Sequence, residues 1–254
     1  MKLFAASLLG VLSLALPIFA FAAADAAPVY ELRIYYTNPG KMPDLLKRFR
    51  EHTCQLFEKH GMVNVGYWLP VEKADQDKLY YVLKHASRDA AKASWKAFGD
   101  DPDWKAVRDA SEAAGKIVTK VDSTFLAATD YTPAAIPTLT GGHVFELRTY
   151  TCNEGKLDTL DTRFRDHTMK LFAKHGMTNV LYTHPTDDTK GAGKTLVYLL
   201  AHTSVDAAKK SFDAFRADPD WIKVRDASEA NGKLLAISPP ASVFLNPTDF
   251  STLK

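Results

Sequence analysis

The sequence predicts an α+β protein in which two tandem ferredoxin-like βαββαβ units pack sheet to sheet, close a barrel and leave their helices outside. Three observations predict this fold: an internal repeat, the same order of strand and helix patterns in both copies, and a connecting segment rich in Pro, Gly and Thr. The chain has 254 residues, of which 46% are hydrophobic and 24% are charged. This composition is typical of a globular protein and excludes disordered, collagen-like and coiled-coil chains.

The internal repeat has a period of about 115 residues, which is the size of a small domain rather than of a solenoid unit. Residues 29–35 (VYELRIY) return as residues 144–150 (VFELRTY), and residues 59–62 (KHGM) return as residues 174–177. After a two-residue insertion near Gly191, the sequence DPDW also occurs in both copies. The predicted boundaries are 28–131 for the first domain, 132–142 for the linker and 143–250 for the second domain.

The elements within each copy follow the order strand, helix, strand, strand, helix, strand. In the first copy, alternating β-branched and aromatic residues predict a strand at 29–36, and apolar residues at helical spacing predict a helix at 41–60. The later predicted elements are strands at 62–69 and 78–85, a helix at 89–98, a second helix at 104–118, and a strand at 121–128. Asp101 and Pro102 separate the last two helices as a cap and a first-turn proline. Both helices of such a unit cover one sheet face, so two copies can bury their free faces against each other.

The first 24 residues have the layout of a secretory signal peptide. Lys2 precedes an apolar run, Pro17 breaks it, and small residues follow, with cleavage expected within residues 22–27. The alternative is an uncleaved anchor, because the uncharged run of about 22 residues could just span a bilayer. The first arginine is Arg33, which argues against a mitochondrial presequence. We therefore expect a periplasmic or secreted protein that is not bound to a membrane after cleavage.

The first strand of each copy carries the charged residues that point to a site. Glu31, Arg33 and Tyr35 alternate with apolar Leu32 and Ile34, and we expect the apolar pair to face the helices. The charged residues would then enter the space between the two sheets, joined there by their repeats Glu146, Arg148 and Tyr150. One interpretation is crosswise ion pairs that fix how the copies pack. The other is a ligand-binding site in which an arginine holds an anionic or carbonyl-bearing molecule.

Two repeated histidines, His85 and His202, end a strand in each copy and are expected near a barrel mouth. There they are candidate acid/base residues, or axial ligands if a haem is bound, although no cofactor is predicted. The sequence has no motif for zinc, calcium, nucleotide phosphates or a serine nucleophile. A formal net charge of +2 spread over both halves excludes a strong nucleic-acid partner. Cys54 and Cys152 form either a disulfide or two separate thiols.

Taken together, the motifs resemble the NIPSNAP domain. The resemblance rests on the opening VYELRxY pattern of each copy, Pro-Gly-Lys before the first helix, Phe-x-x-His at Phe49 to His52, Lys-His-Gly after it, and Trp-x-x-Phe followed by DPDW. The second copy departs from the pattern, with Phe212 in place of Trp95. The resemblance implies a dimeric α/β-barrel fold made here within one chain, and it implies no settled reaction or catalytic residues.

These observations leave three hypotheses about function. The first is an exported protein that binds a small, partly apolar or anionic ligand between its sheets. The second is a cofactor-independent monooxygenase or isomerase, or a haem-using enzyme, in which an arginine stabilises an oxyanion. The third is a module that binds a protein partner through its surface. Both a single chain and a homo-oligomer are compatible with the sequence.

Overall fold

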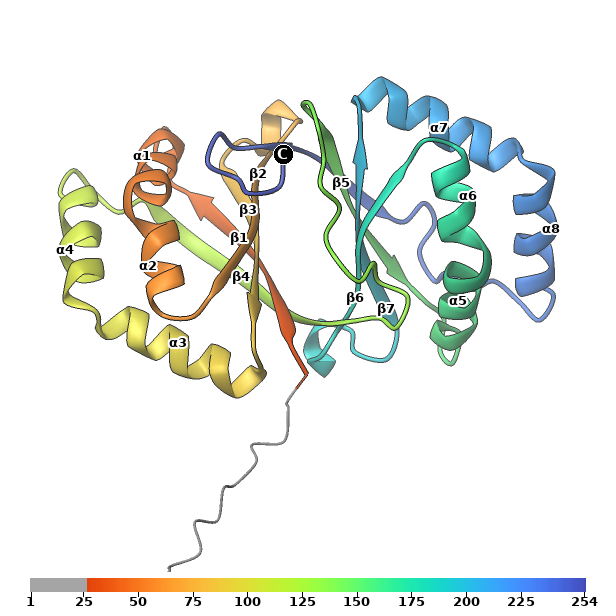
Figure 1. Ribbon diagram of the computed structural model, residues 1–254, viewed down its shortest axis with the longest axis horizontal. Helices are drawn as coiled ribbons and strands as arrows, with labels where there is room; N and C mark the ends of the chain where they lie inside the picture. The colour runs from red at the N-terminus through yellow and green to blue at the C-terminus, as the bar shows by residue number, and fades with distance from the viewer. Residues whose placement is uncertain (1–26) are drawn as a thin grey trace, which may run out of the picture.

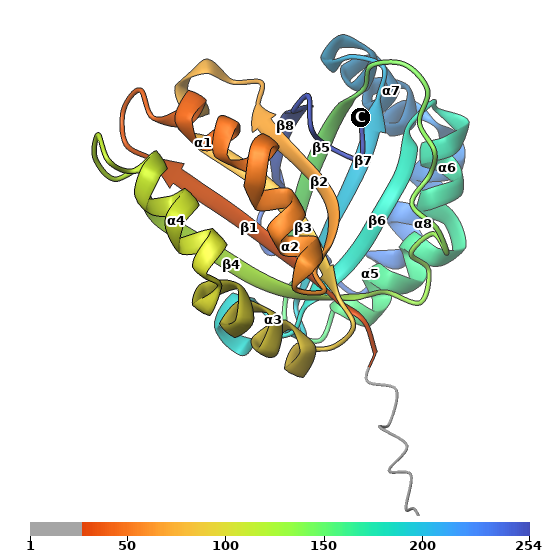
Figure 2. The same ribbon diagram turned by 60° about the vertical axis from the view of Figure 1, so that its left-hand side comes forward.

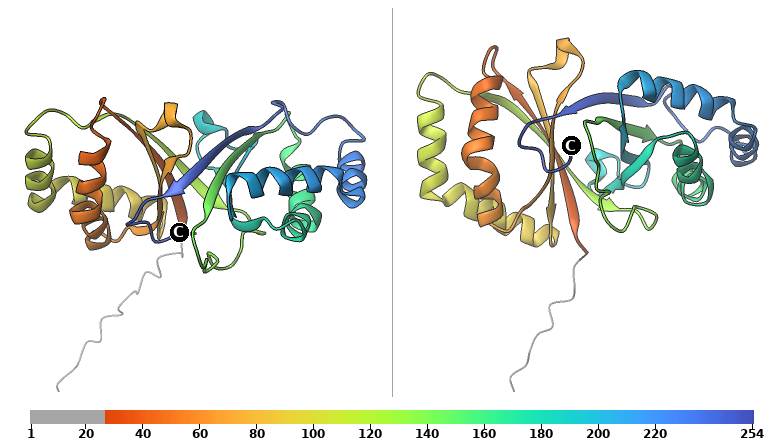
Figure 3. Two further views of the ribbon diagram at one scale, coloured as in Figure 1. Left: turned by 90° about the horizontal axis from the view of Figure 1, so that it is seen from above. Right: turned by 45° about the horizontal axis from the view of Figure 1, so that its top comes forward.

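The structure is a computed structural model that describes residues 27–254 (Figure 1). The predicted signal peptide at 1–24 and most of its cleavage range lie outside the described residues. Within the described part of the chain, no helix combines the length and apolar character that crossing a membrane requires. The two sheets face each other across the centre of the molecule, and the helices lie on the two outer flanks (Figures 1 and 3).

Each unit contributes four strands and two helical layers. The first unit comprises β1 Val29–Thr37, α1 Met42–Arg48, η1 Phe49–Thr53, α2 Cys54–Lys59, β2 Val63–Pro70, η2 Lys73–Asp75, β3 Lys78–His85, α3 Arg88–Asp100, α4 Pro102–Ser111 and β4 Val118–Ala128. The second comprises β5 Val144–Thr151, α5 Leu157–Arg163, η3 Phe164–Thr168, α6 Met169–Lys174, β6 Thr178–Pro185, η4 Asp188–Lys190, β7 Thr195–His202, α7 Val205–Ala217, α8 Pro219–Ser228 and β8 Ala241–Pro247.

The eight strands form one closed barrel in the order β1-β3-β2-β8-β5-β7-β6-β4. Within the first unit, β1 pairs with both β3 and β4, and β2 pairs with β3, all antiparallel. The second unit repeats this pattern with β5, β7, β8 and β6. Pairing of β2 with β8 and of β4 with β6 joins the two units. The predicted fold, two ferredoxin-like units packed sheet to sheet as an intramolecular α/β barrel, is confirmed.

The helices begin where the sequence predicts them, but one helix ends earlier. The Asp101 side chain accepts a hydrogen bond from the amide of Asp103, and Pro102 opens α4. The predicted helix at 104–118 is too long, since α4 ends at Ser111 and a turn follows. Gly115 adopts a φ of 109° in that turn, a conformation that favours glycine. The chain then enters β4 at Val118.

The first helical layer of each unit contains a five-residue π-helical turn that the sequence pattern does not predict. In η1 the Thr53 hydroxyl donates to the carbonyl of Arg48, five residues earlier, and Thr168 does the same to Arg163 in η3. These bonds accompany the wider helical turn at the same place in both copies. A π-helical turn is frequent at functional positions, which directs attention to the two arginines.

Two apolar cores lie between sheet and helices, and a third fills the barrel. Phe49 and Tyr81 belong to the core under the helices of the first unit, whereas Leu32 and Ile34 pack against the central core. The central core also contains Phe145 of the second unit, so it lies between the sheets. Figure 2 shows α1 to α4 on the outer face of the β1–β4 sheet. Burial of both sheet faces explains why this fold is stable within one chain.

A two-residue segment after the last strand of each unit, Asp130-Tyr131 or Asp249-Phe250, contacts the other unit and is called the clasp. Asp130 accepts two hydrogen bonds from Arg165, at 2.8 and 2.7 Å, and Asp249 accepts two from Arg50, both at 2.7 Å. The next residue of each clasp inserts an aromatic ring into the opposite core. The ring contacts are Tyr131 with Phe164 and Tyr182, and Phe250 with Phe49 and Tyr67. The same ion pair and aromatic contact therefore join the units in both directions, once from each copy of the repeat.

The two cysteines are separate free thiols. Cys54 packs against the core of the first unit, and Cys152 lies in the core of the second. Burial raises the pKa of each thiol to about 11, so both are weak nucleophiles at neutral pH. Of the two alternatives drawn from the sequence, separate thiols is the one observed.

Candidate functional site

The charged residues of β1 face the helices, so the prediction that they point between the sheets is wrong. The Glu31 side chain is 1% exposed, and its Oε1 accepts hydrogen bonds from Arg33 Nη1 at 2.5 Å and Ser123 Oγ at 2.7 Å. Its Oε2 accepts from Trp95 Nε1 of α3 at 2.7 Å and lies 3.0 Å from His85 Nε2. The carboxylate is thus surrounded by donors from its own unit. The alternative of crosswise ion pairs between the copies is also wrong, because each arginine pairs within its own strand.

The Arg33 guanidinium is held between the sheet and α3 by aromatic groups. Its Nε donates to the Tyr81 hydroxyl at 2.8 Å, and its Cζ lies 4.2 Å from the centre of the Trp95 ring and 5.5 Å from that of Tyr35. This stacking is favourable for a planar guanidinium. The cation is therefore partnered before any ligand binds.

The second unit repeats the network with one donor fewer. Glu146 accepts hydrogen bonds from Arg148 and from Ser242 Oγ, the latter at 2.5 Å, and its Oε2 lies 3.1 Å from His202 Nε2. Phe212 replaces the tryptophan of the first unit and stacks under the arginine at 4.5 Å without donating a hydrogen bond. The Glu146 carboxylate is thus less fully satisfied than its counterpart.

Both carboxylates stay ionised in spite of burial. Burial alone would raise the pKa of Glu31, but the hydrogen bond from His85, the charge of Arg33 and the bond from Ser123 outweigh it and hold the pKa at about 2. The same balance of burial against these partners lowers the pKa of Glu146. Each network therefore contains an ionised carboxylate next to a cationic arginine, with no net charge from that pair.

A chamber of about 120 Å³ lies in the second unit between the sheet and the helices. Aromatic residues make up half of its lining, and the polar lining groups are a phenol, two guanidinium groups, a carboxylate and a threonine hydroxyl. The lining residues are Tyr150, Arg163, Phe164, Thr168, Phe172, Phe215, Trp221, Arg225, Glu229 and Leu235. Of the six residues expected to bind a ligand, Tyr150 is the one that lines this chamber.

Arg148 connects the charged network to the chamber wall. Its Nε donates to the Tyr198 hydroxyl at 2.9 Å, and its Nη2 lies 3.4 Å from the Tyr150 hydroxyl. Nearby Glu146 pairs with the same guanidinium. Arg148 therefore joins the Glu146 carboxylate to the Tyr150 phenol, and its remaining N–H groups point to hydroxyls that could carry developing negative charge.

Arg163 lies between the chamber and the outer surface. Its side chain is 4% exposed, Nη1 donates to Ser228 Oγ at 3.1 Å, and Glu229 lies at 3.5 Å. Its Cζ lies 5.0 Å from the centre of the Trp221 ring, and its Nε is buried without a hydrogen-bond partner among the described residues. Burial lowers the pKa of this guanidinium, which nevertheless stays protonated at neutral pH. A buried, unsatisfied N–H costs free energy that a ligand oxygen would recover.

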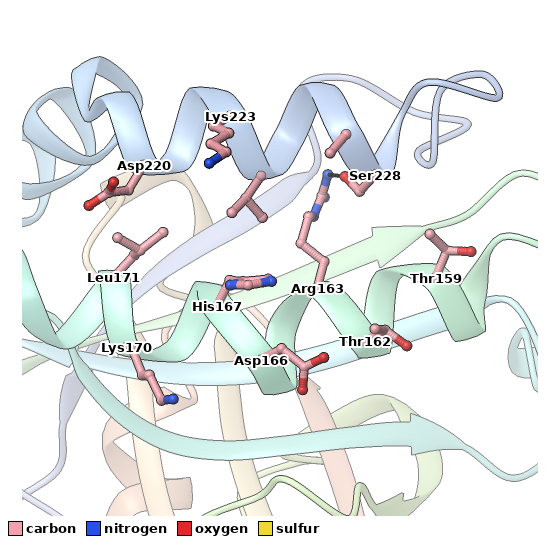
Figure 4. A pocket seen from close by; sticks show the side chains of 12 residues that line it. Thr159, Thr162, Arg163, Asp166, His167, Lys170, Leu171, Asp220, Lys223 and Ser228 are labelled. Atoms are coloured by element: carbon pink, nitrogen blue, oxygen red, sulfur yellow. Dashed lines mark hydrogen bonds between the residues drawn. The ribbon is translucent and has the colours of Figure 1, made fainter.

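Outside Arg163, an open groove of about 640 Å³ runs between α5, η3 and α6 on one side and α8 on the other. Figure 4 shows Arg163 extending from the first helical layer toward Ser228 on α8, with His167 beside it. Arg163 lines both this groove and the chamber, so it separates the two spaces. The first unit has a matching groove of about 620 Å³ that includes Arg48 and His52. Nothing in the sequence pattern singles out these grooves.

The middle of the barrel, where the sequence places a ligand, is filled by side chains. A cavity of about 20 Å³ remains there, lined by apolar groups such as Leu32, Trp68, Leu181 and Leu245. This volume is close to that of one water molecule, and its apolar wall offers water few partners. The predicted position of a ligand in this packed centre is therefore wrong.

The two histidines expected at a barrel mouth are buried instead in the charged networks. His85 and His202 are each 2% exposed and direct Nε2 at the glutamates. Because the ionised glutamates accept, Nε2 is the protonated nitrogen, and Nδ1 has no partner among the described residues. Their role in acid/base catalysis stays a prediction.

The residues around these histidines do not fit a haem. Neither His85 nor His202 lines the chamber, and the chamber of about 120 Å³ is far smaller than the roughly 300 Å³ or more that drug-sized ligands occupy. A haem is at least as large as such ligands. Within residues 27–254, no group of three or more His, Cys, Asp or Glu side chains is arranged to hold a metal ion.

The sequence matches the NIPSNAP family over residues 30–133 and 145–252, one match for each unit of the barrel. The chain belongs to the NIPSNAP family. This confirms the resemblance drawn from the repeated motifs, and it makes the molecule a tandem NIPSNAP protein whose two domains share one barrel. No curated protein matches the chain.

Solved structures share the fold of this tandem NIPSNAP protein at low sequence identity. A "putative monooxygenase" from Fusobacterium nucleatum matches with a TM-score of 0.57 and 10% identity, covering 90% of this chain and 99% of that one. A second protein of that name, from Lactobacillus acidophilus, matches with a TM-score of 0.52 and 11% identity, covering 87% of this chain and 94% of that one. A NIPSNAP family protein from Agrobacterium tumefaciens has 21% identity and a TM-score of 0.38, covering 42% of this chain and 98% of that one. At these identities the first two likenesses concern the fold alone.

Proposed function

We propose that this NIPSNAP protein binds a small anionic ligand, about the size of one aromatic ring, in the chamber of the second unit. The observation that carries the proposal is a chamber of about 120 Å³ with an aromatic wall and the unsatisfied Nε of Arg163. An apolar cavity of roughly 150 Å³ is large enough to bind benzene. The chamber is slightly smaller than that cavity, so we expect it to hold the ring of a benzoate-like molecule, with the carboxylate at the wall formed by Arg163.

The polar groups of the chamber favour an anion over a neutral ring. Arg163 and Arg225 line the chamber together with the carboxylate of Glu229, and Arg225 is also paired with Asp226 at 2.8 Å, so the unsatisfied Nε of Arg163 is the group that favours an anion. A ligand carboxylate or phenolate facing Arg163 would satisfy its Nε, while the Tyr150 hydroxyl offers a second hydrogen bond. Ring stacking against Phe164 and the other aromatic groups would hold the apolar end of the ligand.

The first unit provides matched controls, because nine of the ten lining positions carry the same residue in both copies. The exception is Leu235, which aligns with Val118. The partner of Arg163 is Arg48, whose Nε is also buried without a hydrogen-bond partner among the described residues. Variants at these two pairs of positions distinguish binding in the second unit from binding in the first.

Isothermal titration with benzoate tests the proposal. We expect saturable binding to the wild type, and a loss of roughly tenfold or more in affinity for R163M, since a charged hydrogen bond contributes about 1.5–3 kcal/mol. L235F fills the chamber without removing a charge and should weaken binding as well. R48M and V118F should bind as the wild type does. Unchanged binding in folded L235F, or no binding of benzoate to the wild type, would contradict the proposal.

A second candidate function is catalysis on the bound ligand, and the position of Arg148 favours it. This cation contacts the hydroxyls of Tyr150 and Tyr198, so it could stabilise an oxyanion that forms next to the chamber. The chemistry would be of the cofactor-independent monooxygenase or isomerase type, and two fold neighbours carry the name putative monooxygenase.

Oxygen uptake and deuterium incorporation with hydroxylated benzoates test this candidate. R148K should lose turnover and keep binding, and a wild type that binds these ligands without converting any would refute catalysis.

We also propose that the mature protein acts in the periplasm or as a secreted protein. The signal-peptide layout of residues 1–24 supports this location. Fractionation of expressing cells, with mass analysis of the N-terminus, tests it. A full-length chain retained in the cytoplasm would contradict it.

A further inference from the structure

One end of the barrel carries a cleft of about 650 Å³ that is separate from the chamber of the second unit. Its walls come from the starts of β1, β2 and β6, the end of β3, the linker and the last residues of the described chain. The lining residues are Tyr30, Val63, Asn64, Val65, Lys84, Pro133, Ala134, Ala135, Ile136, Pro137, Thr138, Leu139, Val180, Leu181, Thr252, Leu253 and Lys254. The volume lies within the range of roughly 300–1,000 Å³ that small-molecule sites occupy.

The charged side chains that line this cleft are cationic. Two lysines, Lys84 and Lys254, line it, and no aspartate or glutamate side chain does. Lys254 Nζ donates to the carbonyl of Asp249 at 2.6 Å. Lys84 is partly buried at the end of β3, and no carboxylate of the described chain lies within ion-pair distance of its Nζ. An ammonium without a counter-ion favours an anionic ligand.

The polar pair at this end breaks the symmetry of the duplicated chain. Tyr30 lies directly across from Lys84 in the pairing of β1 with β3, and the ammonium lies 5.9 Å from the centre of its ring. The Tyr30 hydroxyl makes no hydrogen bond within the described residues, and burial raises its pKa, so it is a neutral donor. The equivalent residues of the second unit, Phe145 and Ala201, are both fully buried in the central core. Packing alone is thus satisfied by apolar residues at these positions.

The rest of the cleft is an apolar surface that a hydrocarbon chain could cover. Ile136 and Leu139 of the linker pack against the central core, together with Leu181 and Leu253. Val63 on the rim is 56% exposed, which is unusual for a large hydrophobic residue in this protein. An occupant with an anionic head and an apolar body would match both parts of the cleft.

We propose that this cleft binds an amphiphilic carboxylate, with its head group on Lys84 and Tyr30 and its hydrocarbon chain under the linker. The ligand carboxylate would accept one hydrogen bond from the Lys84 ammonium and one from the Tyr30 phenol. The site uses residues from both units and the linker, so binding would also hold the linker against the barrel end. It is independent of the benzoate-sized chamber, with which it shares no lining residue.

Isothermal titration of the mature protein with octanoate, octanol and octylammonium tests this proposal. We expect octanoate to bind at least roughly tenfold more tightly than octanol, because an ammonium-carboxylate hydrogen bond is stronger than a neutral one. Octylammonium should bind most weakly. The variants K84A and Y30F place at these positions the residues that the second unit has, Ala201 and Phe145, so both should fold. K84A should abolish the preference for octanoate over octanol, and Y30F should reduce it.

Two controls separate this site from general surface binding and from the chamber. K105M removes an exposed lysine on α4 and should leave octanoate affinity unchanged, and L235F blocks the chamber and should also leave it unchanged. Wild-type affinity for octanoate in folded K84A would overturn the proposal. Equal binding of the three probes, absence of saturable octanoate binding, or loss of octanoate binding in L235F would overturn it as well.

Discussion

The packing of Trp68 inside the barrel leads to a prediction about paired substitutions. Gly66 and Trp68 of β2 align with Leu181 and Thr183 of β6, so a small and a large residue are exchanged between the two copies. A Cβ atom added at Gly66 would lie 2.4 Å from two atoms of the Trp68 ring. The indole therefore occupies the space that a side chain at position 66 would need.

The size of the effect follows from this overlap. G66L overpacks a closed core and should cost about 1–3 kcal/mol of unfolding free energy, and W68T leaves a cavity and should cost about 3–5 kcal/mol. The double variant G66L/W68T reproduces the pair found in the second unit. It should be more stable than the sum of the single changes predicts, by about 1–3 kcal/mol.

Urea unfolding of the four proteins measures this coupling, with melting temperature as a second readout. A coupling of 1 kcal/mol corresponds to a shift of about 2–4 °C in a protein of this size. Additive effects of G66L and W68T would contradict this prediction, because they would mean that the two positions do not compete for the same volume. The test also bears on the finding that the centre of the barrel is packed rather than hollow.

Two further predictions concern buried and partly buried charges. E31Q and E146Q each leave a largely buried arginine without its carboxylate and should destabilise the protein by about 3–5 kcal/mol. The larger loss is expected in E31Q, because Glu31 also accepts a hydrogen bond from Trp95. Equal or negligible losses in urea unfolding would contradict this. Since the pKa of Glu31 is about 2 in the folded protein, against 4.5 ordinarily, its contribution is present above pH 4.5 and is lost as pH falls toward 2. For His184, burial would lower the pKa, but the Asp161 carboxylate 3.1 Å away and the Thr195 carbonyl raise it above 6.5. Its stabilising contribution is therefore complete below pH 6.5 and is lost as pH rises, so H184L should cost more stability at about pH 6 than at about pH 9, and a pH-independent cost would refute this.

Much of the fold could be predicted because the same pattern of strands and helices occurs in both copies of the internal repeat. The repeat at 29–35 and 144–150 defines two equivalent units, and the order of patterns within each unit is that of a ferredoxin-like domain. The helix start at Asp101 and Pro102 is also predictable, since Asp is a preferred N-cap residue and Pro is preferred in the first helical turn. The C-terminal end of helix α4 is harder to predict, because residues 112–118 contain no strong helix breaker other than Gly115.

The orientation of β1 could not be predicted, because both faces of the strand are buried. Alternation identifies which residues share a face, and it correctly groups Glu31, Arg33 and Tyr35. It does not say which face is covered by helices when each face has a core of its own. The structure decides in favour of the helices, since Trp95 of α3 and Ser123 of β4 supply donors to Glu31 that the neighbouring unit does not.

The chamber could not be predicted from a motif, because its residues come from separate strands and helices. One signal was present, however, in the repeated RFR sequence at residues 48–50 and 163–165. Its first arginine is buried in both copies and lines the chamber in the second, and its last arginine forms the clasp with the opposite unit. An arginine kept on the inner side of a helix is a reason to look for an anion or a carboxylate nearby.

A crystal structure of the mature protein soaked with 4-bromobenzoate shows directly whether the chamber binds an aromatic carboxylate, because anomalous scattering locates the bromine without ambiguity. We expect bromine between Phe164 and the other aromatic rings of the chamber, with the ligand carboxylate against Nε of Arg163. Bromine in the barrel centre or in the outer groove, with the chamber filled by protein side chains, would contradict it.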